Sequence, residues 1–198
     1  KEDPAWSGKA ILDEHDGGTS DDCIALRGRK RYAQKLAPLS VTAPTALPKR
    51  IKEGGRYVIT GGIGGIGLAL ARYLGGTAKA QLALIGRSAF PARDEWDTIL
   101  KSTPASSVAG SINAIREIEE AGGKVLMLSA DVTDKTMLAS ALDEVKTQFG
   151  GIDGVFHGAG IMDDAPMLGK SLDDTHRVLS AKVTGGGNLA ALLPEGSL

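Results

Sequence analysis

A glycine-rich loop at residues 60–67 is the feature that most constrains the fold of this chain. Its glycines satisfy the spacing G-x-G-x-x-G and also T-G-x-x-x-G-x-G, with a short β-rich run before the loop and a helical pattern after it. Glycines at such a strand-to-helix turn let backbone amides approach a pyrophosphate, and the unpaired N–H groups of the helix N-terminus attract the anion. The loop therefore predicts a dinucleotide site rather than a turn that serves packing alone. Its residues are Thr60, Gly61, Gly62, Ile63, Gly64, Gly65, Ile66 and Gly67.

Short apolar runs and helical patterns alternate from residue 56 onward. The apolar runs lie at 57–60, 81–85, 124–128 and 154–157, and continuous runs of this kind are typical of strands in a buried parallel sheet. The sequence therefore predicts the α/β class, with a Rossmann-type doubly wound parallel sheet. The helical stripes are Ile66, Leu70 and Leu74, then Trp96, Ile99 and Leu100, then Ile112, Ile115 and Ile118, then Leu138, Leu142, Val145 and Phe149, and a last helix over 172–193. The glycine pairs expected to end helices are 75–76, 122–123 and 150–151.

The first fifty residues have a different character. They are predicted to be irregular, with two short strands that meet at Gly28 and a proline-containing linker that includes Pro44. We therefore expect one domain over 1–50 and a second over 51–198. A basic cluster in the strand pair suggests nucleic-acid binding, but neighbouring aspartates favour a solvated hairpin. The basic residues are Arg27, Arg29, Lys30, Arg31 and Lys35, and the aspartates are Asp21 and Asp22.

Composition excludes several classes of function. A net charge of −1 argues against nucleic acid or an anionic membrane as the main partner. The single cysteine, Cys23, excludes an internal disulfide framework and a multi-cysteine metal site, so no metal is expected. No apolar run approaches the length of about 20 residues that a membrane span needs, and the charged start is not a signal peptide. A cytoplasmic setting is therefore expected.

The end of the second predicted strand indicates which dinucleotide is bound. An NAD-binding site usually places an acidic residue there, which accepts a hydrogen bond from the ribose 2′-hydroxyl. This chain has Gly86, Arg87 and Ser88 instead. A guanidinium binds a 2′-phosphate in bidentate fashion, and a serine hydroxyl adds a donor. A solvated loop arginine is the alternative interpretation, but the missing acid favours NADPH.

Three further motifs carry a resemblance to a known family. They are Asp131-Val132, His157-Gly158-Ala159-Gly160 and Ala181-Lys182-Val183. With these and the glycine loop, the chain resembles the ketoreductase domain of modular polyketide synthases, a branch of the short-chain dehydrogenases/reductases. The resemblance implies that 1–50 is the end of a smaller structural, non-catalytic subdomain plus a linker, and that 51–198 is the NADPH-binding catalytic subdomain.

The resemblance also implies roles for single residues. Asp131 and Val132 would contact the adenine, since Asp134 fits the helix N-cap better. His157, Gly158, Ala159 and Gly160 would line the cofactor after the fourth strand, with His157 in a structural role. Lys182 would be the catalytic lysine that supports proton delivery. The run Met162, Asp163 and Asp164 resembles the Leu-Asp-Asp motif of ketoreductases that give a D-configured (B-type) hydroxyl.

Part of the family's active site has no counterpart in this sequence. The family uses a serine, an asparagine and a proton-donating tyrosine, whereas the tyrosines here, Tyr32, Tyr57 and Tyr73, all precede the fourth predicted strand. The sequence ends at Leu198, where the serine-bearing strand would begin, so 51–198 is expected to be incomplete at its C-terminus.

Three functions are compatible with these features. The first is a part of a ketoreductase that, with NADPH, reduces a β-ketoacyl chain on the phosphopantetheine arm of an acyl carrier protein, beside other polyketide synthase domains. The second is a truncated or inactive ketoreductase-like domain that serves as a scaffold. The third is a free-standing reductase of a small carbonyl compound, which residues 1–50 and Lys182 disfavour.

Overall fold

A computed structural model of the chain describes residues 4–17, 21, 23–27, 29–41 and 46–193. It divides into two compact units, residues 1–43 and 44–198. Leu47 and Ile51 pack against the core of the second unit, so the segment before its first strand belongs to that unit. Gly28 and Pro44, expected in a turn and a linker, lie outside the described residues, as does the segment 194–198.

In the smaller unit, the described residues form one helix and one hairpin. Strands β1 (Ile24–Arg27) and β2 (Lys30–Ala33) pair antiparallel, which confirms the predicted strand pair. The prediction of irregular structure before them is wrong, because Pro4–Asp16 forms helix α1. Its apolar residues include Ile11 and Leu12, both more than 60% exposed, so no buried stripe marked this helix in the sequence.

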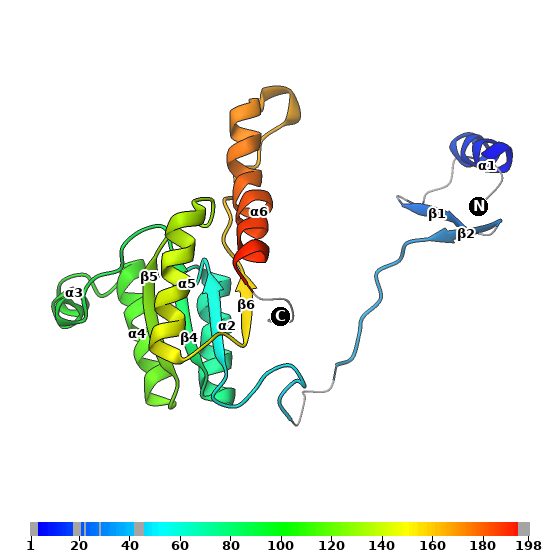
Figure 1. Ribbon diagram of the computed structural model, residues 1–198. Helices are drawn as coiled ribbons and strands as arrows, with labels where there is room; N and C mark the ends of the chain where they lie inside the picture. The colour runs from blue at the N-terminus through cyan, green and yellow to red at the C-terminus, as the bar shows by residue number, and fades with distance from the viewer. Residues whose placement is uncertain (1–3, 18–20, 22, 28, 42–45, 194–198) are drawn as a thin grey trace. The chain divides into compact units, whose positions relative to one another are not determined.

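The larger unit is built on a four-stranded parallel sheet. Its strands are β3 (Arg56–Thr60), β4 (Gln81–Gly86), β5 (Lys124–Ser129) and β6 (Gly154–His157), in the order β5-β4-β3-β6 (Figure 1). All three neighbouring pairs are parallel. This arrangement confirms the predicted doubly wound sheet, and it brings the carboxyl ends of all four strands to one edge.

Helices cover both faces of this sheet. Along β3, Tyr57 and Ile59 face one core while Val58 faces the other, as the alternation of a strand requires. The first core lies under α2 (Gly65–Ala78), α3 (Trp96–Ser102, after the short 3₁₀ helix Arg93–Glu95) and α4 (Ser107–Glu120). The second lies under α5 (Lys135–Phe149) and α6 (Leu172–Leu192), the latter preceded by the 3₁₀ turn Met167–Gly169. Among the described residues, no helix is both long and apolar enough to cross a membrane.

Helix α2 differs from the prediction at both ends. Ile66, expected in the buried stripe, is 86% exposed, and its neighbours Gly64 and Gly65 at the start of α2 are exposed as well. The glycine pair at 75–76 does not end the helix, which continues to Ala78 and is capped by Lys79 in the left-handed conformation. Gly75 is needed for close packing instead, since a Cβ there would lie 2.5 Å from Cγ2 of Ile118 on α4.

An ionic cluster joins the starts of β3 and β6 at the opposite, amino edge of the sheet. The carboxylate of Asp153, only 11% exposed, accepts hydrogen bonds from the backbone N–H of Arg56 at 3.0 Å and from its Nε at 2.7 Å. It also accepts one from the ammonium of Lys52 at 2.8 Å. The Arg56 guanidinium, more than any other group, holds the pKa of Asp153 well below its usual range.

We expect the Asp153→Asn variant to lower the free energy of unfolding at pH 7 by about 1.5–3 kcal/mol, the usual worth of hydrogen bonds to a charged group. Because the folded-state pKa lies below the unfolded one, this contribution is present above about pH 4 and is lost as the pH falls below it. Urea unfolding at several pH values measures the difference. Asp143→Asn, which removes an exposed ion pair with Lys146, is the control. A deficit in Asp153→Asn that stays constant down to pH 3 would contradict the assignment.

Candidate functional site

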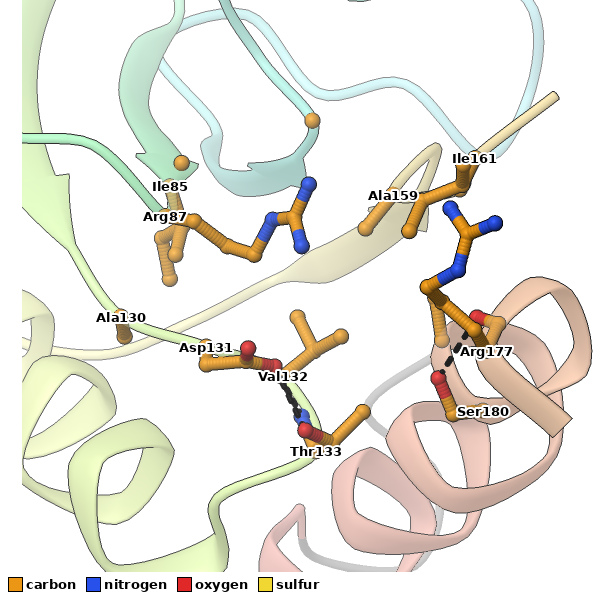
Figure 2. Close-up of a pocket in the computed structure, with 14 residues that line it drawn as sticks. Ile85, Arg87, Ala130, Asp131, Val132, Thr133, Ala159, Ile161, Arg177 and Ser180 are labelled. Atoms are coloured by element: carbon orange, nitrogen blue, oxygen red, sulfur yellow. Dashed lines mark hydrogen bonds between the residues drawn. The ribbon is translucent and has the colours of Figure 1, made fainter. Parts of the chain in front are cut away.

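A groove lies at the carboxyl edge of the sheet and is formed by the loops that follow the strands and by α6. Figure 2 shows Arg87, after β4, and Asp131, after β5, opposite Ala159 and Ile161, which follow β6, and Arg177 on α6. Such an edge is where open α/β sheets bind their ligands. The full lining is Gly61, Ile85, Gly86, Arg87, Ala130, Asp131, Val132, Thr133, Ala159, Gly160, Ile161, Arg177, Ser180 and Ala181.

The glycine loop fits a dinucleotide because its backbone is packed too tightly for side chains. Gly61 has a φ of 67°, and a Cβ there would lie 2.9 Å from the backbone N of Ala159. A Cβ on Gly67 would lie 2.4 Å from the carbonyl oxygen of Gly61. A Cβ on Gly65, by contrast, would meet no protein atom within 4 Å, so the start of α2 faces open space.

The N-terminus of α2 has no side-chain cap. Gly64 occupies the cap position without a capping hydrogen bond, and the first turn contains no acidic residue. The N–H groups of this turn are therefore available to an anion, and the helix dipole favours one. Together with the open space at Gly65, this is the cradle that a pyrophosphate requires.

Arg87 reaches into the groove from the end of β4 (Figure 2). Its side chain is exposed and forms no ion pair with any residue that the structure describes. Its backbone carbonyl accepts a hydrogen bond from the Ser129 hydroxyl at 2.9 Å, which fixes the start of the loop to β5. Ser88, predicted beside it, is exposed but does not line the groove.

Asp131 is less free than the sequence suggested. Its Oδ1 accepts hydrogen bonds from the backbone N–H of Thr133 at 2.8 Å and from its hydroxyl at 2.7 Å. The Thr133 bonds, with a smaller contribution from the charge of Arg87, lower the pKa of this carboxyl. Asp134 caps α5, as predicted, by accepting from two backbone N–H groups. Asp131 therefore presents an oriented, ionised carboxylate to the groove.

Thr60 and His157 form a hydrogen-bonded link inside the protein. The Nε2 of His157 lies 2.8 Å from the carbonyl oxygen of Ala181 on α6, and a carbonyl only accepts. In the neutral ring, Nδ1 then accepts from the Thr60 hydroxyl at 2.7 Å, and that hydroxyl accepts from the N–H of Ala159 at 3.2 Å. The two side chains tie β6 to β3 and α6. Neither residue is part of the lining of the groove, and both side chains are engaged in this structural link.

Lys182 follows Ala181 on α6 and lies beside the turn after β6. A Cβ on Gly160 would be 3.6 Å from the Lys182 Nζ, so a larger residue there would crowd the ammonium. The Lys182 side chain is exposed and has no hydrogen-bonding or ionic partner within the described ranges. A free ammonium at the rim of the groove is able to act on a bound ligand.

The loop that carries Met162, Asp163 and Asp164 extends past the carboxyl edge of the sheet with the first turns of α6 (Figure 1). Asp163 is anchored: its carboxylate lies 2.5 Å from Nη2 of Arg177, and its carbonyl accepts a hydrogen bond from the Lys170 ammonium. Met162 is 92% exposed, and Asp164 is also exposed. Asp163 thus anchors the loop to α6, whereas the side chains of Met162 and Asp164 are exposed to solvent.

Several residues of the groove were not predicted from the sequence. Arg177, Ser180 and Ala181 contribute one face of α6. Their i, i+3, i+4 spacing indicates a shared helix face, but nothing in it tells which surface that face meets. The remaining ones are Ile85, Gly86, Ala130, Thr133 and Ile161, each of which lies within two positions of a residue that was predicted.

The model of the KR (ketoreductase) domain family matches residues 55–198, well over half of the chain. The chain belongs to the KR domain family. This ketoreductase domain is therefore a member of a family of pyridine-nucleotide-dependent oxidoreductases.

Relatives of the ketoreductase domain are found in large polyketide synthases. Polyketide synthase PksL of Bacillus subtilis (strain 168) is 37% identical over 192 residues, which cover 94% of this chain and 4% of that protein. The 6-methylsalicylic acid synthase of Penicillium patulum is 33% identical over 183 residues, 90% of this chain and 10% of that protein. The chain thus spans a tenth or less of the length of these relatives.

Solved ketoreductases have the same fold. The structure of an A1-type ketoreductase superposes with a TM-score of 0.67 at 29% identity, over 96% of this chain and 36% of that one. An N-terminal ketoreductase from the macrolactin assembly line gives a TM-score of 0.62 at 28% identity, over 84% of this chain and 29% of that one. A short-chain type dehydrogenase/reductase from Mycobacterium marinum gives a TM-score of 0.57 at 27% identity, over 72% of this chain and 50% of that one.

Proposed function

We propose that this chain is the cofactor-binding part of a polyketide synthase ketoreductase. The reaction is the NADPH-dependent reduction of a β-ketoacyl thioester, carried on the phosphopantetheine arm of an acyl carrier protein, to the β-hydroxyacyl form. The observation that carries the proposal is the free ammonium of Lys182 beside Gly160, at the rim of a groove whose glycine cradle fits a pyrophosphate.

The residues of the groove divide the dinucleotide between them. The uncapped start of α2 holds the pyrophosphate, and Arg87 binds the 2′-phosphate of NADPH from the groove, with the hydroxyl of the exposed neighbour Ser88 as a further donor. Asp131 and Val132 contact the adenine, with the carboxylate accepting from its amino group. Ala159 and Gly160 line the ribose on the nicotinamide side, since small residues there leave room for it.

When bound, the cofactor supplies the hydride that adds to the β-carbonyl carbon of the substrate. The carbonyl oxygen gains a proton at the same time, and Lys182 supports the delivery of that proton by favouring the anionic form of the donor. Tyr57 is not this donor, because it is buried and its hydroxyl accepts from the backbone N–H of Lys52 at 2.8 Å, at the amino edge of the sheet. We propose that the donor is a tyrosine outside these 198 residues.

The loop over the groove selects the stereochemistry. Met162 and Asp164 are exposed on a loop whose middle residue, Asp163, is fixed to Arg177. We assign to it the D-configured (B-type) product, on the likeness of Met-Asp-Asp to the Leu-Asp-Asp motif. The partners that we propose for this chain are the acyl carrier protein and the other domains of a polyketide synthase.

A scaffold that binds dinucleotide without turnover is the second candidate. It is favoured by one observation, that no tyrosine lines the groove among the residues that the structure describes.

A titration and an assay test both candidates. NADPH fluorescence is expected to report saturable binding to this chain. A β-ketoacyl thioester is expected to be reduced by a protein that joins this chain to the tyrosine-bearing segment, and to remain unreduced with the chain alone. Binding without turnover in the joined protein would favour the scaffold, turnover by these 198 residues would overturn the assignment of the proton donor, and absence of binding would contradict both candidates.

A further inference from the structure

One face of α6 holds the adenine end of the groove together. Ala181, Gly185 and Asn188 recur at i, i+4 and i+7, so they lie in a row along the helix. Ala181 accepts the hydrogen bond from His157 described above. The other two meet the loop between β5 and α5, which carries Asp131.

Asn188 donates two hydrogen bonds to that loop. Its Nδ2 lies 3.0 Å from the carbonyl oxygen of Val132 and 3.1 Å from that of Thr133. Two adjacent carbonyls call for a donor with two hydrogens, and a side-chain amide nitrogen provides both. The side chain is half-buried, so loss of the amide would leave two carbonyls with poor access to water.

Gly185 lets the helix come this close. A Cβ there would lie 2.7 Å from Cγ2 of Val132 and 3.5 Å from Cε1 of His157. Val132 is 5% exposed, so its side chain is clamped between α6 and the core. Helix α6 therefore fixes the loop in two ways, through the Val132 side chain and through the carbonyls of Val132 and Thr133.

The same loop is fixed from within by Asp131 and Thr133. Oδ1 of Asp131 accepts from the Thr133 N–H and hydroxyl, and that N–H belongs to the same peptide group as the Val132 carbonyl, which Asn188 holds. A shift of the Thr133 peptide would therefore rotate the Asp131 carboxylate, which lines the groove with Arg87. The position of the carboxylate depends on the amide of Asn188 through this chain of contacts.

We propose that Asn188 is a positioning residue for the nucleotide. It sets the Val132–Thr133 carbonyls and, through them, the carboxylate that receives the adenosine end of the dinucleotide. The inference rests on the proposed function, since it assigns the adenine to this end of the groove. It also makes α6 the element that relates this end to Lys182, because both residues are on the same rigid helix.

The test compares the chain's two asparagines, Asn188 and Asn113. Asn113 is exposed on α4 and is the matched control. Leucine has a similar size to asparagine but no hydrogen-bond donor. Asn188→Leu is therefore expected to weaken the binding of both NADPH and adenosine 2′,5′-bisphosphate by about tenfold, at a temperature where the variant is fully folded. Asn188→Asp, which places a carboxylate against the two carbonyls, is expected to weaken both at least as much, and it decides the matter if the leucine variant does not fold. Asn113→Leu and Asn113→Asp are expected to bind as the unchanged chain does.

A measurement on the unchanged chain gives an independent readout. The side-chain NH₂ resonances of Asn188 are expected to shift on titration with NADPH, while those of Asn113 stay in place. Weakened binding together with this shift supports the proposal. Unaltered affinities in folded Asn188 variants, or resonances of Asn188 that do not respond to bound NADPH, overturn it, as does an equal loss in the Asn113 variants. Failure of the unchanged chain to bind NADPH would instead reject the proposed function.

Discussion

Gly67→Ala is expected to abolish dinucleotide binding, with a loss of affinity of about a hundredfold or more. The added methyl would lie 2.4 Å from the carbonyl oxygen of Gly61 and 2.8 Å from Cα of Gly62, closer than any real Cβ contact. Both neighbours are backbone atoms, so neither can move without displacing the loop. That loop also determines the direction of the first N–H groups of α2, on which pyrophosphate binding rests. A loss of about 3 kcal/mol corresponds to a factor of more than a hundred.

Isothermal titration with NADPH measures this loss, and thermal unfolding shows that the variant is folded. Gly76→Ala is the matched control, because a Cβ at that exposed helical position meets no atom within 4 Å. It is expected to bind NADPH as the unchanged chain does and to unfold at a slightly higher temperature, since alanine favours a helix over glycine. Full affinity in a folded Gly67→Ala chain would show that the glycine loop does not hold the pyrophosphate.

The sheet was predictable because its signals are local. Continuous apolar runs and aliphatic stripes lie within single segments, and burial of both sheet faces leaves few other arrangements for them. The wrong predictions concern features that depend on packing between segments far apart in the sequence. Gly75 does not end its helix. The position is a glycine because a side chain there would occupy the space of Ile118, which lies more than forty positions later in the sequence. Helix α1 was not predicted, because its apolar residues form no buried stripe.

The groove residues that could be predicted are those that closely follow the strands. Gly61, Arg87, Asp131 and Gly160 all lie at strand ends, and parallel strands bring those ends to one edge. The contributions of α6 could not be found in this way. Asn188 meets the loop near residue 132 across 56 positions of sequence, and a helical asparagine has no pattern that tells what it contacts.

Arg87→Ala is expected to raise the Kd for NADPH about ten- to a hundredfold, and to leave the Kd for NADH unchanged. The difference between the two cofactors is the 2′-phosphate, and charge-assisted hydrogen bonds from a guanidinium are worth about 1.5–3 kcal/mol. The Arg87 side chain is suited to this role because no carboxylate among the described residues forms an ion pair with it. Since the interaction is exposed, the preference for NADPH should also weaken as salt is raised.

Fluorescence titrations with both cofactors measure the two constants for the unchanged chain and the variant. Arg72→Ala is the control, because Arg72 is an exposed arginine on α2 that pairs with Glu117 at 2.8 Å and does not line the groove. It should change neither constant. The ratio of the two constants is what matters, since general damage to the groove would weaken both cofactors alike. Equal losses for NADPH and NADH in Arg87→Ala would therefore remove the basis for assigning NADPH, while the dinucleotide site itself would stand on the glycine loop.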